Sequence, residues 1–165
     1  MNPELLQISL SVLEHDEARG LPGRAGMPYK DTTGNWTIGI GHLIGLFLTE
    51  LKLSENIILE LFKEDLAKAI DGARRIIRHD TWDRMGIYRK VALISMLYTL
   101  GETKFSRFKE TIDLINAEKW GELADHILTL KWARDIDPRQ RVGIGRDDRI
   151  AFMFRTDSLH PAYIK

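Results

Sequence analysis

The chain has 165 residues, and its 24 lysines and arginines balance its 24 aspartates and glutamates, so the net charge is zero with neutral histidines. A balanced charge excludes a global positive field that would attract nucleic acid. Because the chain has no cysteine, it can form no disulfide, thiolate nucleophile or thiolate metal site. Its 44% hydrophobic and 29% charged residues are typical of a soluble globular domain that needs no staple to bury a core.

Neither a membrane span nor an export signal is expected. The longest apolar run, "VALISMLYTL" at residues 91–100, is much shorter than the 18 or so residues that cross a bilayer. It therefore indicates a buried core helix and no membrane insertion. Glu4 stands where a signal peptide carries positive charge, which argues against export.

Helical spacing of apolar residues predicts a first helix over residues 3–18, ending near Arg19 or Gly20. Pro3 suits the first turn of this helix. The apolar positions are Leu5, Leu6, Ile8, Val12 and Leu13. The stretch "GLPGRAG" at residues 20–26 follows, and its three glycines and proline indicate a loop.

The stretch "DTTGNWTIGIGHL" at residues 31–43 predicts a hairpin. Asp31 and Gly34 fit the ends of a turn. In the strand that follows, bulky residues alternate with small ones. The bulky positions are Trp36, Ile38 and Ile40, and the small ones are Thr37, Gly39 and Gly41. Glycine in a strand often marks the close approach of a ligand, so we expect the bare face to floor a cleft.

Everything after residue 53 is expected to be helical. Ser54 is a suitable N-cap for a long helix over residues 54–77, which carries one apolar stripe. Four further helices are predicted over residues 85–100, 106–115, 119–132 and 147–154, with Gly101 ending the first of them. One small hairpin and about six helices indicate the α+β class.

Four strings occur in the order of one known family: "HDEAR" at 15–19, "YKDTTGNWTIGIGH" at 29–42, "LGETKFSRF" at 100–108 and "RDDRIAFMFRTD" at 146–157. Together they resemble the T-even phage lysozymes, glycoside hydrolase family 24. The resemblance implies a lysozyme-like α+β fold, mostly helical, with a small antiparallel β-hairpin lobe and an active-site cleft between two lobes.

It also implies one domain over residues 1–165. The small β lobe is expected at about 18–53, the helical lobe at about 1–17 and 76–165, and a connecting helix at about 54–77.

Glycosidic cleavage needs one protonated and one ionised carboxyl group. Glu17 lies near the carboxyl end of the first helix, where carbonyl dipoles help a carboxyl group to keep its proton. Asp31 begins the hairpin turn, where a carboxylate stays ionised and can orient water. Thr37, on the bare face, can direct its hydroxyl at the same water. The resemblance makes Glu17, Asp31 and Thr37 the catalytic residues of an inverting mechanism, with carboxyl groups about 6.5 to 9.5 Å apart.

A second glutamate, Glu14, is an alternative candidate for the general acid. Glu17 and Asp31 are fourteen positions apart (31 minus 17), which is longer than the usual spacing in the family, so residues 20–26 resemble an insertion. Residues 133–145 also resemble one. Glu14 lies one helical turn before Glu17 on nearly the same face and is the alternative acid. Without the resemblance, Glu17 is read as a surface charge and Asp31 as a turn former.

The resemblance adds three supporting residues. It pairs His42 with Asp65 of the long helix, a pair expected to stabilise the fold when the histidine is protonated. It pairs Arg146 with the catalytic glutamate, and the alternative for Arg146 is a surface charge at a helix start.

Three more positions match the family's cleft lining: Tyr98, Thr99 and Thr111. Tyr98 fits a core position equally well.

The expected reaction is hydrolysis of the β-1,4 bond between N-acetylmuramic acid and N-acetylglucosamine in bacterial peptidoglycan by a monomer, without metal or cofactor. For a phage protein it implies host lysis, residence in the host cytoplasm until release, and a separate holin-type protein that opens the membrane. Zero net charge differs from the basic character of similar proteins and implies weaker or less salt-dependent wall binding.

Two other functions stay open. A non-hydrolytic peptidoglycan-binding or virion structural module would keep the fold, and a lytic transglycosylase would leave an anhydro sugar. Asp31 and Thr37 argue against the first, and Asp31 against the second. A designed member of the family is a further possibility.

Overall fold

The computed structural model describes residues 2–18, 27–30, 34–44, 53–131 and 145–164, and for residues 17 and 18 the backbone alone. Its elements are α1 (Pro3–Ala18), β1 (Tyr29–Lys30), β2 (Trp36–Ile38), β3 (His42–Leu43), α2 (Glu55–Ile76), α3 (His79–Arg84), α4 (Ile87–Leu100), α5 (Glu102–Phe105), α6 (Lys109–Asn116), α7 (Trp120–Thr129), α9 (Arg146–Thr156) and the 3-10 helix η3 (Pro161–Tyr163).

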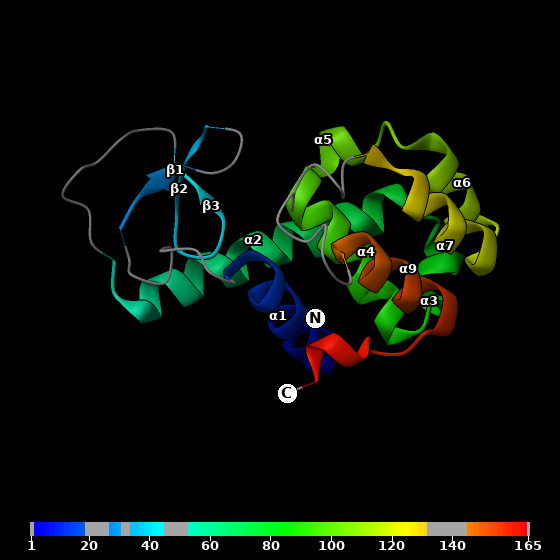
Figure 1. The fold of residues 1–165 in the computed structure, drawn as a ribbon, viewed down its shortest axis with the longest axis horizontal. Helices are drawn as coiled ribbons and strands as arrows, with labels where there is room; N and C mark the ends of the chain where they lie inside the picture. The colour runs from blue at the N-terminus through cyan, green and yellow to red at the C-terminus, as the bar shows by residue number, and fades with distance from the viewer. Residues whose placement is uncertain (1, 19–26, 31–33, 45–52, 132–144, 165) are drawn as a thin grey trace.

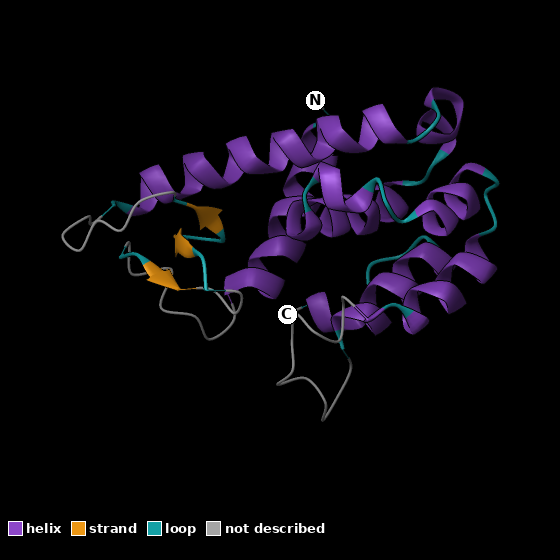
Figure 2. Ribbon diagram, turned by 90° about the horizontal axis from the view of Figure 1, so that it is seen from above, coloured by secondary structure: helices purple, strands orange, loops and turns teal. Residues whose placement is uncertain are grey.

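A small sheet lies at one end of the molecule and the helices gather at the other (Figure 1). Helix α2 starts beside the sheet and runs into the helical part, which a second view from above shows as well (Figure 2). In the helical part, α7 packs against α9, and α4 packs against α1, α2 and α9. The predicted α+β class is confirmed.

Helix α2 forms where the apolar stripe predicts it. The Ser54 hydroxyl accepts a hydrogen bond from the Ile57 amide at 3.5 Å and caps the helix, which satisfies one of its unpaired amide groups. One face of the helix is buried and consists of Ile58, Phe62, Leu66, Ala69, Ile70, Gly72 and Ala73. This face packs on α4, so α2 joins the sheet to the helical core.

Helix α4 is the centre of the core. Seven consecutive residues, 91–97, are buried, because other helices cover α4 on several sides. Gly101 ends the helix with a φ of 74°, a conformation that glycine adopts without strain. At the other end, Asp157 accepts hydrogen bonds from the amides of Tyr88 and Arg89 at 3.2 and 3.1 Å. The predicted helix over 85–100 is therefore slightly shorter, and α3 before it was not predicted.

The sheet corrects the hairpin prediction. Strand β2 ends at Ile38, and the expected strand residues Gly39 and Gly41 form a turn with φ of 61° and 75°. A third strand, β3, then pairs antiparallel with β2, with Ile38 opposite His42. The two glycines thus serve the turn, because L-residues rarely adopt positive φ. Gly39 also lies directly against Ile58 of α2, so in the described structure this position faces a helix and does not floor a cleft.

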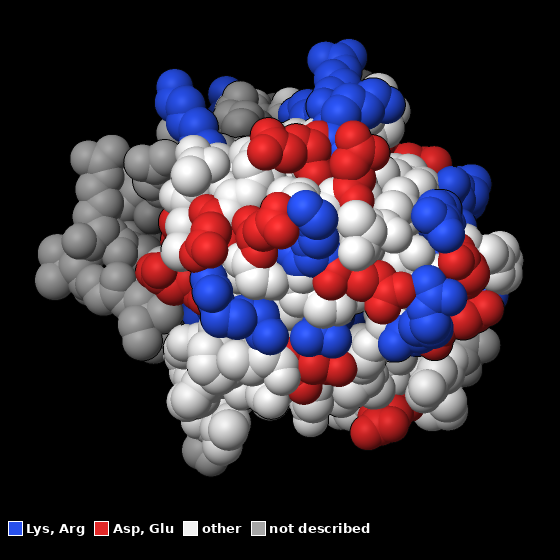
Figure 3. All heavy atoms as spheres, turned by 90° about the vertical axis from the view of Figure 1, so that its right-hand side faces the viewer, with Lys and Arg blue, Asp and Glu red and all other residues white. Residues whose placement is uncertain are grey.

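Charge is mixed on one face of the molecule. Figure 3 shows acidic and basic side chains interspersed on the face at the right-hand end of Figure 1. Exposed pairs in the described part of the chain include Arg84 with Glu118 and Arg155 with Asp125, each at 2.6 Å. No helix among the described residues is long and apolar enough to cross a membrane.

Candidate active site

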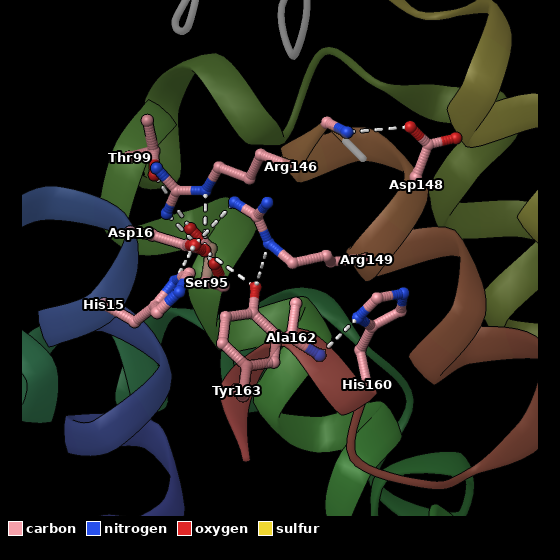
Figure 4. A network of polar contacts seen from close by, with 11 residues as sticks. His15, Asp16, Ser95, Thr99, Arg146, Asp148, Arg149, His160, Ala162 and Tyr163 are labelled. Carbon is pink, nitrogen blue, oxygen red and sulfur yellow. Dashed lines mark hydrogen bonds and ion pairs between the residues drawn. The ribbon is translucent and has the colours of Figure 1, made fainter. Parts of the chain in front are cut away.

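The last turn of α1 carries Glu17, the expected acid, whose side chain lies outside the described residues. The residue before it, Asp16, is described in full and lies at the centre of a network of polar contacts (Figure 4). Its side chain has no exposed surface. The position of the α1 terminus is therefore fixed through a buried carboxylate one residue from the expected acid.

Four side chains surround the Asp16 carboxylate. Arg149 of α9 donates from Nη2 to Oδ1 at 2.8 Å, and the Tyr163 hydroxyl of η3 donates to Oδ2 at 2.9 Å. The Arg146 Nε lies 3.2 Å from Oδ2, and the His15 Nδ1 lies 3.3 Å from Oδ1. Both arginine side chains are 2% exposed. Burying charges is favourable only when they are paired and hydrogen-bonded. The Asp16 carboxylate meets that condition, because Arg149 and Tyr163 donate hydrogen bonds to it and Arg146 lies within ion-pair distance.

The network also determines the protonation states of Asp16 and Tyr163. Burial alone would raise the pKa of Asp16, but the contacts with His15, Arg146, Arg149 and Tyr163 outweigh it and hold the pKa below its ordinary value. Burial and the Asp16 charge raise the pKa of Tyr163. Asp16 is therefore an anion and the Tyr163 hydroxyl a neutral donor at physiological pH.

Arg146 is a buried residue at the start of α9, so the alternative of a surface charge is wrong. Its Nη2 donates to the Ser95 hydroxyl of α4 at 3.0 Å, and its Nε faces Asp16. The pairing with Glu17 that the resemblance implies falls on a side chain outside the described residues. Arg146 nevertheless lies beside the turn that carries Glu17.

The sheet holds Thr37, the described member of the expected catalytic set. Thr37 is 3% exposed, and its hydroxyl donates to the Asn35 carbonyl at 3.3 Å. It pairs with Tyr29 on one side and Leu43 on the other. The expectation that its hydroxyl is directed at a water bound by Asp31 stays a prediction, because Asp31 lies outside the described residues.

Two described side-chain contacts tie the sheet region to the helices. His42 Nδ1 lies 2.6 Å from Asp65 Oδ2 of α2, the pair that the resemblance implies. The Tyr98 hydroxyl of α4 donates to the Ile40 carbonyl at 2.6 Å, and its ring packs edge-on against Phe62. Tyr98 is thus half-buried and links α4 to the turn after β2.

The other two expected sugar contacts behave differently. Thr99 donates its hydroxyl to the Ser95 carbonyl of its own helix at 3.0 Å. Thr111 is 0% exposed, and its hydroxyl lies 3.1 Å from His126 Nε2, so a direct contact between Thr111 and a sugar does not fit its burial. His126, 17% exposed, borders a groove of about 380 Å³ between α6 and α7.

Three residues of the buried network were missed by sequence reasoning: Asp16, Arg149 and Tyr163. The signal that could have found one of them, Arg149, is its spacing from Arg146, which places both arginines on one helix face. Tyr163 gives no such signal, because it meets Asp16 across 147 positions of sequence. Among the described residues, no group of three or more His, Asp or Glu side chains is arranged to hold a metal ion.

Comparison with known proteins assigns the chain to a family. The family model for phage lysozyme matches residues 20–145, which is well over half of the chain. The chain is 28% identical to probable T4-type lysozyme 2 of Dictyostelium discoideum over 171 residues, covering 90% of this chain and 94% of that protein. It is also 28% identical to probable T4-type lysozyme 1 of the same organism over 144 residues, covering 73% and 82%. The chain therefore belongs to the phage lysozyme family.

Proposed function

We propose that this protein is a lysozyme that hydrolyses the β-1,4 bond between N-acetylmuramic acid and N-acetylglucosamine in bacterial peptidoglycan. Family membership supports a glycoside hydrolase of lysozyme type. The observation that carries the proposal is that the family match over residues 20–145 includes Asp31 and Thr37, while the buried network around Asp16 fixes the turn that carries Glu17.

In this proposal Glu17 is the general acid that protonates the leaving oxygen. Asp31 is the general base that activates a water on the opposite face of the sugar, and the Thr37 hydroxyl helps to hold that water. Attack from the opposite face inverts the anomeric carbon, so a β bond yields an α reducing end. The reaction needs no cofactor, because two carboxyl groups supply both proton transfers.

Substrate binding is assigned to the surface between the sheet and α4 and to the groove between α6 and α7. Tyr98 presents the part of its ring not covered by Phe62, while its hydroxyl is committed to Ile40. In the groove, His126 lies among the exposed polar side chains of Arg107, Lys109 and Glu110, and the buried Thr111 orients its ring.

The biological role proposed for a phage source is host lysis. The enzyme stays in the host cytoplasm until a holin-type protein opens the membrane, and it acts as a monomer on the cell wall. Similar proteins also occur in the amoeba Dictyostelium discoideum, so the proposed cleavage of peptidoglycan and the proposed role in host lysis are two separate claims. Peptidoglycan cleavage is independent of the source of the chain, whereas host lysis is specific to a phage.

The test is digestion of purified peptidoglycan with mass spectrometry of the released fragments. We expect muropeptides with an intact reducing end, and NMR taken early in the reaction should show that the α-anomer forms first. Fragments that carry a 1,6-anhydro sugar would instead identify a transglycosylase. Sedimentation of the protein with the wall without any release of fragments would identify a binding module.

A further inference from the structure

We propose that Asp16 is a positioning residue for the acid Glu17: it anchors the last turn of α1 to α9 and η3, and it offsets the positive charge of two buried arginines beside that turn. This inference rests on the proposed function, since it assigns Asp16 a role in the same reaction. It concerns a buried charge that hydrolysis of the glycosidic bond does not itself require.

Hydrogen bonds join Asp16 in the last turn of α1 to α9 and η3. Asp16 receives hydrogen bonds from Arg149 of α9 at 2.8 Å and from Tyr163 of η3 at 2.9 Å. Arg149 Nε also donates to the Tyr163 hydroxyl at 3.1 Å, so the three side chains form a closed ring (Figure 4). A buried ring of charge-assisted hydrogen bonds holds its members in one geometry.

Charged and polar groups from three elements face Asp16. From α9 these are the cations Arg146 and Arg149, from α1 the imidazole of His15, and from η3 the hydroxyl of Tyr163. The Ser95 hydroxyl of α4, bound to Arg146, is uncharged. Neutralising Asp16 therefore removes one negative charge from beside two guanidinium groups.

Glu17 feels this change in charge because it is the next residue. The Cα atoms of Asp16 and Glu17 are about 3.8 Å apart, a separation much shorter than the distance over which charges interact at low ionic strength. Neutralising Asp16 lets the arginines favour the ionised form of Glu17 and makes its proton easier to lose. Neutralising Arg149 does the opposite. A general acid must be protonated, so these changes move the basic limb of the pH–activity profile in opposite directions.

The experiment measures reducing ends released from soluble glycan strands as a function of pH, at constant low ionic strength, for the parent and three variants of the same cluster. Relative to the parent, Asp16→Asn is expected to shift the basic limb down by about half a pH unit to one unit, and Arg149→Gln to shift it up by a similar amount. Tyr163→Phe, which removes a hydrogen bond without changing charge, should lower stability and leave the limb in place.

The outcomes separate the inference from the proposed function. An inactive parent protein would sink the proposed function. An active parent whose Asp16→Asn and Arg149→Gln variants keep the parent profile, or shift it in the same direction, would overturn the role of Asp16 and leave the lysozyme assignment intact. If Asp16→Asn does not fold, the upward shift in Arg149→Gln against the unshifted Tyr163→Phe still decides the question.

Discussion

At the scale of single residues, the site depends on side chains that lie far apart in the sequence. Asp16 and Tyr163 are in contact although 147 positions separate them. The pattern of hydrophobic residues in the sequence indicates neither of them. Asp31 and Thr37 were found through a specific string of neighbouring residues. A local string of residues thus indicated the proposed base, whereas the contacts of Asp16 with Arg149 and Tyr163 are found only in the folded structure.

The first prediction concerns acid stability. The pKa of Asp16 is lowered in the folded state, so its stabilising contribution is present above the ordinary value of 3.8 and is lost as the pH falls through the folded value. We expect the melting temperature of Asp16→Asn to lie well below that of the parent at neutral pH. The difference in melting temperature between the two proteins should become small in strong acid, where Asp16 of the parent is also protonated.

Thermal unfolding followed by circular dichroism between neutral and strongly acidic pH checks this. Asp125→Asn is the control, because Asp125 is 71% exposed and pairs with Arg155 on the surface, where ion pairs contribute little. A melting-temperature gap for Asp16→Asn that is constant with pH would contradict the account of Asp16.

The second prediction concerns Gly39. A Cβ there would lie 2.6 Å from Ile58 Cγ2, and φ is +61°. Gly34 has a φ of +87° with nothing within 4 Å of its Cβ position. Gly34→Ala should therefore lose about 1 to 2 kcal/mol from backbone strain, and Gly39→Ala about 1 to 3 kcal/mol more from overpacking. Denaturant unfolding gives both values, and equal losses would show that Ile58 does not crowd this turn.

At the scale of elements, helices were predicted well where one apolar stripe runs through them. Helix α1 ends close to the expected boundary, and α2 spans Glu55–Ile76 against a predicted helix over 54–77. The short helices α3 and α5, of six and four residues, were missed, because they hold too few residues for a periodic pattern. The second strand of the predicted hairpin was too long, because the alternation of bulky and small residues continues through Gly39 and Gly41, which form a turn.

The third prediction concerns the link between α4 and the sheet. Tyr98→Phe keeps the ring against Phe62 but leaves the Ile40 carbonyl without its donor, so we expect a loss of about 1 kcal/mol. Amide hydrogen exchange should become faster in β2 and β3. The matched control is Tyr88→Phe on the same helix, since the Tyr88 hydroxyl has no hydrogen bond within the described part of the chain. Equal exchange in both variants would exclude a stabilising link.

At the scale of the whole molecule, the fold and the net charge have different consequences for the proposed function. The fold is of the lysozyme-like α+β class, while the net charge of zero provides no net long-range attraction to an anionic wall. On the face that Figure 3 shows, acidic and basic side chains are mixed. The sequence allowed the α+β class to be predicted correctly. The resemblance implied one of the two contacts that hold the sheet region against the helices, that of His42 with Asp65. The other, between the Tyr98 hydroxyl and the Ile40 carbonyl, was not predicted, because these residues are 58 positions apart.

The fourth prediction follows from this charge. Attraction between a neutral protein and an anionic wall is local, so added salt has little long-range attraction to screen. We expect the rate of wall digestion to change less than about twofold between low and physiological ionic strength. Turbidity measured against sodium chloride concentration checks this, with a strongly basic lysozyme as the reference. A steep fall in rate for this protein would reveal a concentrated basic surface that the net charge conceals.

The most direct measurement of the central claim is the clearing of chloroform-permeabilised Gram-negative cells by the parent and by Glu17→Gln, Asp31→Asn and Glu14→Gln. We expect the parent and Glu14→Gln to clear the suspension at similar rates, and Glu17→Gln and Asp31→Asn to be at least about a thousandfold slower. Circular dichroism establishes that each variant is folded. Loss of clearing in Glu14→Gln with activity retained in Glu17→Gln would contradict the assignment of the acid, and a parent that clears nothing would contradict the assignment of a lysozyme.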